Sequence, residues 1–141
     1  MRVTFDTNVF EKYRVNAGEL ARSFRFSAVV IQELTAGAWD GDEVTAWADV
    51  RVEYEKDNRL LVPTGEDWWF AGKVLNSLLR TPSRRGRTSI GKDEQRLLIR
   101  DTLIARTAKR DGVTVITQDL DDFAKIQRFC AVKLMHPDQY F

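Results

Sequence analysis

The chain has 141 residues, 43% of them hydrophobic and 30% charged, which is typical of one globular domain with a single core. The formal net charge of +1 argues neither for nor against a nucleic-acid partner. A single cysteine, Cys130, excludes an internal disulfide framework, and a single histidine, His136, disfavours zinc sites and histidine-based triads. No apolar run approaches the ~20 residues of a membrane span, so we expect a soluble, cytoplasmic protein.

Strands and helices are predicted to alternate along the chain. Short apolar stretches predict strands at residues 2–5, 27–31, 60–62, 113–116 and 131–135. Helical patterns lie at residues 9–13, 17–24, 42–57, 66–79, 93–110 and 120–129, and residues 80–92 read as a loop. This alternation predicts an α/β fold in which helices cover both faces of a parallel sheet.

Four acidic residues stand at the end of a predicted strand or on a buried helix face. Asp6 follows VTF, Glu33 follows SAVVIQ and Asp119 follows VTVITQ. Asp101 lies inside a helix, and its face also carries the apolar residues at i−4, i+4 and i+7 (Leu97, Ala105 and Ala108). Taken alone, Asp6 is better explained as a helix cap than as part of a site, and any one buried acid is often simply paired with a basic side chain.

The four acids together favour a cation site. The carboxyl ends of adjacent parallel strands meet at one edge of a sheet, where ligands bind in open α/β folds. Carboxylates that lie so close together repel one another. This repulsion raises the pKa of at least one of them unless a cation lies between them. Oxygen ligands without histidine or cysteine favour Mg²⁺ or Mn²⁺, and such an ion can polarise a phosphodiester and activate water.

Three segments together resemble the PIN domain, and in particular the VapC-type toxins of bacterial and archaeal toxin–antitoxin pairs. They are VTFDTNVF, SAVVIQEL and DTLIARTAKRDGVTVITQDLDDF, and with their order and spacing intact the resemblance covers essentially the whole chain. It implies one PIN-like nuclease domain over residues 1–141, with a five-stranded parallel sheet of order 3-2-1-4-5. It also implies a metal-dependent endoribonuclease that acts as the toxin of a type II toxin–antitoxin system.

The resemblance assigns roles position by position. Asp6, Glu33, Asp101 and Asp119 match the acidic cluster that binds Mg²⁺ or Mn²⁺ for RNA cleavage. Polar positions that support this cluster match Asn8, Thr117 and Asp122. A small antitoxin and a homodimer are the implied protein partners, and the surplus of tryptophan in the middle helices adds to the expectation of a dimer.

Other readings remain open from the sequence alone. Arg84, Arg85 and Arg87 lie in the basic loop before the Asp101 helix, and they either form a solvated surface or contact the RNA backbone, which we favour. The four tryptophans are expected against the core or a partner subunit rather than in base stacking. A non-cleaving PIN-like RNA- or protein-binding module is the alternative function. A phosphotransferase with Asp6 as nucleophile is disfavoured, because DTN lacks the second aspartate of a D-x-D loop.

Overall fold

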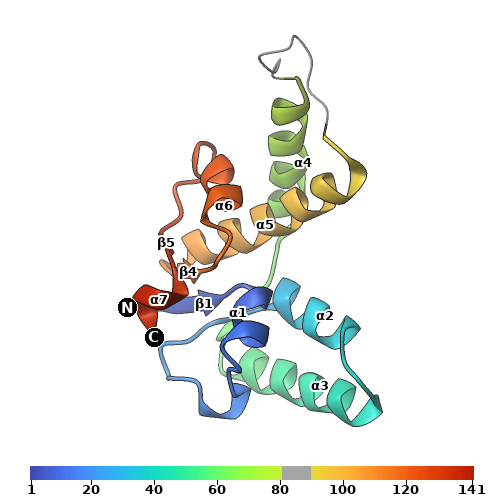
Figure 1. Ribbon diagram of the computed structural model, residues 1–141, viewed down its shortest axis with the longest axis vertical. Coiled ribbons are helices and arrows are strands. Elements are labelled where there is room, and N and C mark those ends of the chain that lie inside the picture. The colour runs from blue at the N-terminus through green and yellow to red at the C-terminus, as the bar shows by residue number, and fades with distance from the viewer. Residues whose placement is uncertain (81–89) are drawn as a thin grey trace.

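The computed structural model describes residues 1–80 and 90–141, and its parallel strands lie between two groups of helices (Figure 1). The strands are β1 (Val3–Phe5), β2 (Phe26–Ser27), β3 (Leu60–Leu61), β4 (Thr114–Ile116) and β5 (Leu134–Met135). The helices are α1 (Thr7–Lys12), α2 (Ala28–Ala36), α3 (Gly41–Lys56), α4 (Gly65–Arg80), α5 (Lys92–Arg110), α6 (Leu120–Gln127) and α7 (Pro137–Tyr140), with a 3-10 turn at Ala17–Glu19. Helices α1 to α3 lie on one side of the strands, and α4 to α6 lie on the other.

The strands form two parallel sheets, so the prediction of one five-stranded sheet with order 3-2-1-4-5 is wrong. One sheet has the order β1-β4-β5 and the other pairs β2 with β3. A single bridge between Val3 and Phe24 connects the two, supported by a 2.8 Å hydrogen bond from Arg25 N to Val3 O. The two residues of β2 pair with β3, and the chain enters α2 directly after them, so among the described residues the strand pairing with β1 is limited to the bridge at Phe24.

The predicted strand at residues 27–31 is instead the end of β2 and the first turn of α2. The Ser27 hydroxyl accepts a 3.4 Å hydrogen bond from Val30 N and so caps the helix at its start. Val29, Val30 and Ile31 are buried as expected, but on a helix. Residues 17–24 form no α-helix but a 3-10 turn at Ala17–Glu19 and the bridge at Phe24, and β5 begins at Leu134 and not at residue 131. The other predicted bounds differ from the structure by no more than two residues at either end.

The long helix α5 is confirmed. It is closed by Gly112, whose φ of 66° lies in the left-handed region that favours glycine after a helix. Asp101, Ala105 and Ala108 are buried on its inner face, whereas Leu97 is 49% exposed and Leu98 takes the inward position.

Aromatic rings fill much of the core on the α1 to α3 side. Phe5, Phe10, Phe24 and Phe26 contact one another, and the rings of Phe10 and Phe26 stack at 5.3 Å. Trp47 packs against this group, but three other tryptophans are exposed in this chain, contrary to a core location: Trp39, Trp68 and Trp69. Within the described residues, no helix has both the length and the apolar character needed to cross a bilayer.

Candidate active site

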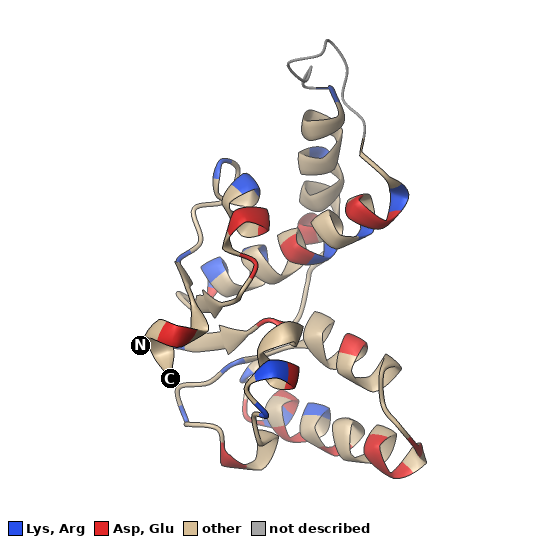
Figure 2. Ribbon diagram, viewed as in Figure 1, with Lys and Arg blue, Asp and Glu red and all other residues tan. Residues whose placement is uncertain are grey.

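The carboxyl ends of β1 and β4 lie side by side and position two of the predicted acids. Phe5 pairs with Ile116 in parallel register, and Asp6 N donates a 3.0 Å hydrogen bond to Ile116 O. Asp6 directly follows β1, and Asp119 lies in the short connection between β4 and α6. Figure 2 shows acidic residues on the chain where it leaves β1 and where it enters α6.

Asp6 is fully buried and serves as more than a helix cap. Its Oδ1 accepts a 2.8 Å hydrogen bond from Thr7 N at the start of α1, so the capping explanation is correct as far as it goes. Its Oδ2 accepts hydrogen bonds from Thr117 Oγ1 at 2.9 Å and Asn8 Nδ2 at 3.3 Å. A helix cap requires neither of these two hydrogen bonds.

Asn8 and Thr117 connect Asp6 to Asp119. The Asn8 amide also donates to Asp119 Oδ2 at 3.0 Å, and Thr117 Oγ1 accepts a 3.0 Å hydrogen bond from Asp119 N. The two polar residues that the sequence singled out therefore lie between the two carboxylates and orient both. Asp119 itself is exposed, beside a cavity of about 430 Å³ that is also lined by Asp121 and Asp122.

A basic residue that the sequence did not single out lies among the other acids. Arg100 on α5 donates from Nη2 to Asp6 Oδ1 at 3.2 Å and from Nη1 to Glu33 Oε2 at 2.8 Å. It also donates to Asp101 Oδ1 from Nε at 2.9 Å and from Nη2 at 2.6 Å. One guanidinium thus joins three predicted site residues, of which one directly follows β1 and the other two lie on α2 and α5.

The pKa values reflect burial and an excess of negative charge. Burial raises the pKa of Asp101 to about 7; the charge of Asp6 adds to this, and the guanidinium of Arg100 opposes it. Desolvation, with the charges of Asp6 and Asp122, raises the pKa of Asp119. Burial lowers the pKa of Arg100, but the charges of Asp6 and Asp101 outweigh it and hold that pKa above its ordinary value.

The remaining predicted residues lie around this network. Glu33, in the second turn of α2, reaches it through Arg100 and through a 3.0 Å hydrogen bond from Thr7 Oγ1. Asp122 is exposed, forms a 3.9 Å ion pair with Lys125 and acts on Asp119 through its charge. The three predicted RNA-binding arginines lie outside the described residues: Arg84, Arg85 and Arg87.

The donor chemistry suits a hard divalent ion, but the arrangement pairs the acids with arginine. Within residues 1–80 and 90–141, no three acidic, cysteine or histidine side chains are grouped so that they could hold a metal ion. The four carboxylates nevertheless outnumber the one guanidinium among them. Asn8 Oδ1 is also buried with no hydrogen-bond partner in the described part of the chain. An oxygen atom without a hydrogen-bond partner, next to carboxylates with excess negative charge, is a suitable ligand for Mg²⁺ or Mn²⁺.

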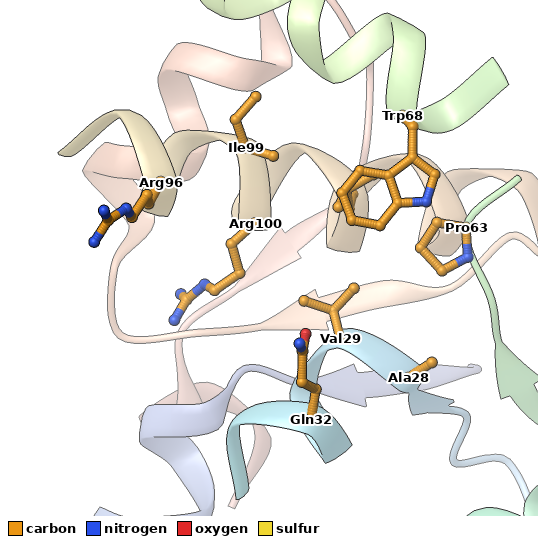
Figure 3. A pocket seen from close by; sticks show the side chains of 9 residues that line it. Ala28, Val29, Gln32, Pro63, Trp68, Arg96, Ile99 and Arg100 are labelled. Atoms are coloured by element: carbon orange, nitrogen blue, oxygen red, sulfur yellow. The ribbon is translucent and has the colours of Figure 1, made fainter. Parts of the chain in front are cut away.

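An apolar pocket of about 340 Å³ adjoins the network through Arg100 (Figure 3). Val29 and Gln32 of α2, Trp68 of α4 and Ile99 of α5 contribute to its lining. Figure 3 shows Arg96 and Arg100 toward one end of this pocket, and the Trp68 ring and Pro63 toward the other. The site therefore combines a polar network with a neighbouring apolar surface.

Sequence reasoning missed two basic partnerships. The residue spacing did not indicate a role for Arg100, because it is adjacent to Asp101 and adjacent residues on a helix normally point in different directions. Asp67, which is fully buried at the start of α4, receives hydrogen bonds from Arg106 and Arg110 of α5. Its helix-start signal was readable, because Thr64 and Asp67 form a reciprocal capping box in TGED.

Solved structures with a similar fold come from two named systems. They are FitAB bound to the IR36 DNA fragment (TM-score 0.59, 18% identity, 96% of this chain and 94% of that chain), FitAcB from Neisseria gonorrhoeae (0.58, 20%, 96% and 97%) and VapBC-1 from nontypeable Haemophilus influenzae (0.55, 21%, 96% and 98%). At these identities the similarity shows the fold alone. No protein-family model and no curated protein matches the sequence. The class defined here is an α/β protein with the fold of chains in these FitAB and VapBC structures.

Proposed function

We propose that this protein is a Mg²⁺- or Mn²⁺-dependent endoribonuclease and the toxin of a type II toxin–antitoxin system. The observation that carries the proposal is the joining of Asp6, Glu33, Asp101 and Asp119 in one hydrogen-bonded network at the ends of β1 and β4. The fold supports the proposal, because its structural neighbours are toxin–antitoxin complexes. Two of these neighbours are VapBC complexes, in agreement with the resemblance of the sequence motifs to VapC-type toxins. An antitoxin, a second copy of the chain, an RNA substrate and a cytoplasmic location belong to the same proposal.

Each residue has a distinct part in this proposal. Asp6, Asp101 and Asp119 would hold the ion, with the spare Asn8 oxygen beside them and Glu33 at the edge. When bound, the ion would supply Lewis-acid activation of a water molecule and of the phosphodiester. Thr117 and Asn8 fix the orientation of Asp6 and Asp119 through the hydrogen bonds described above. Replacing residues that orient metal ligands in this way typically lowers activity by about 10- to 100-fold.

A non-cleaving PIN-like module that binds RNA or protein is the second candidate. The observation that favours it is the engagement of Asp6, Glu33 and Asp101 by Arg100, a cation that the chain itself provides. In that case the acids would serve as a charge-balanced structural network, and the exposed surface around them would do the binding.

Cleavage of total RNA by the purified protein separates the two. We expect cleavage with Mn²⁺ and none with EDTA, and fragments with 5′-phosphate and 3′-hydroxyl ends, because an attacking water displaces the 3′ oxygen. Asp119→Asn should lower the rate by more than the about 10- to 100-fold expected for residues that only orient ligands, because it removes the charge of a proposed ligand. Asp121→Asn is the matched control, since it removes an exposed charge two residues away and should retain activity. RNA binding without cleavage would replace the proposal with the second candidate.

A further inference from the structure

We infer that Arg100 is a built-in counter-cation of the acidic site, which competes with a divalent metal ion for Asp6 and Asp101. This inference rests on the proposed function, because it requires that the site bind such an ion. Arg100 is thus a positioning residue that acts through the carboxylates.

The hydrogen-bond geometry distinguishes Arg100 from an ordinary surface ion pair. Its Nε, Nη1 and Nη2 all donate to carboxylates of the site, and the side chain is only 18% exposed. A planar guanidinium can serve several carboxylates at fixed angles, which the point charge of a lysine cannot do. These hydrogen bonds also draw together β1, α2 and α5, so the guanidinium organises the acids as a metal ion would.

Competition follows from the atoms that Arg100 uses. Asp6 Oδ1 and Asp101 Oδ1 both accept its hydrogen bonds, and these two carboxylates are the most deeply buried ligands proposed for the ion. Two cations held at the same oxygens repel each other strongly in a poorly solvated site. By linkage, each must then weaken the binding of the other.

The structure also provides room for the guanidinium to move. Arg100 lines the apolar pocket of about 340 Å³ between α2, α4 and α5, so open volume adjoins its side chain (Figure 3). On this side the Arg100 side chain therefore borders open volume and not close-packed core.

Isothermal titration calorimetry with Mn²⁺ tests the inference on the full chain. Arg100→Gln should bind Mn²⁺ at least about tenfold more tightly than wild type, because a unit charge a few ångströms from the ion has been removed. Arg96→Gln is the matched control: it removes the same charge one turn earlier on α5, from a residue that lines the same pocket and pairs at 3.5 Å with exposed Asp93. Its affinity should stay within about twofold of wild type.

The outcomes are separable. Equal or weaker Mn²⁺ binding by Arg100→Gln, beside measurable binding by wild type, overturns the role of Arg100 and leaves the proposed nuclease standing. Absence of Mn²⁺ binding in all three proteins overturns both.

A measurement on the wild-type protein guards against misfolding of the variant. In ¹H–¹⁵N spectra, Mg²⁺ should shift the Arg100 Nε–H signal, which Arg100→Lys identifies by removing it. Mg²⁺ that shifts the backbone signals of Asp6 and Asp101 but leaves the Arg100 signal unchanged would also overturn the inference.

Discussion

The raised pKa of Asp101 predicts that the metal-free protein loses stability as pH rises toward neutrality. Asp101 is 3% exposed, and burial raises its pKa to about 7, well above the value of about 4 for an aspartate in an unfolded chain. Between these two values the folded state holds a proton that the unfolded state has released. The contribution to stability is therefore complete below the unfolded pKa and is lost as pH rises through the folded pKa.

The size of the effect follows from the two pKa values. Each pH unit between them lowers the free energy of unfolding by up to about 1.4 kcal/mol. With a folded pKa of about 7, the loss between about pH 5 and about pH 7 is roughly 2 kcal/mol, because the slope flattens as Asp101 ionises in the folded state.

Urea denaturation in EDTA at several pH values measures this loss against Asp101→Asn. The asparagine is neutral at every pH and has nearly the same shape, so titrating groups that do not interact with Asp101 cancel in the comparison. The difference in unfolding free energy between wild type and variant should fall by about 2 kcal/mol across this range. A difference that is constant or rises with pH would refute the assignment of a raised pKa to Asp101.

Two further predictions concern other parts of the molecule. Asp67→Asn should destabilise the protein by about 1.5–3 kcal/mol, because it weakens the charged hydrogen bonds that the buried carboxylate accepts from Arg106 and Arg110, which are themselves partly exposed. Thermal melts check this against Glu66→Gln, whose exposed neighbouring charge should matter little, and equal melting temperatures would contradict the role of Asp67. Replacement of Arg84, Arg85 and Arg87 by alanine should weaken RNA binding and change the log–log salt slope by about 0.7 for each phosphate that these arginines neutralise. An unchanged slope would favour a solvated loop.

The elements that the sequence predicted well are those with a long pattern or clear boundaries. Helix α5 has many turns of periodic apolar residues and a terminal glycine, and its bounds differ from the prediction by one residue. The stretch SAVVI was misassigned because a short apolar run carries no period that separates a strand from a buried helix. In the structure the Ser27 hydroxyl caps α2, and a serine before an apolar run is a helix-start signal that the strand prediction did not use.

The site was predictable where it depends on strand ends and unpredictable where it depends on tertiary packing. Asp6, Thr117 and Asp119 follow β1 and β4, and parallel pairing brings them together. The contacts of Arg100 depend on how α5 packs against α2 and the end of β1, because Glu33 and Asp6 lie 67 and 94 residues away along the chain. The spacing of residues in the sequence does not indicate such long-range packing.

Folding and metal binding make opposite demands on Arg100. In the metal-free protein its guanidinium compensates Asp6 and Asp101, and its removal would leave buried charges unpaired, which is strongly destabilising. For a bound ion the same guanidinium is a repelling neighbour. Arg100→Gln should therefore melt at a lower temperature than wild type in EDTA, yet gain more in melting temperature when Mn²⁺ is added, because tighter binding to the folded state stabilises it more. A residue that is only structural would produce the first effect without the second.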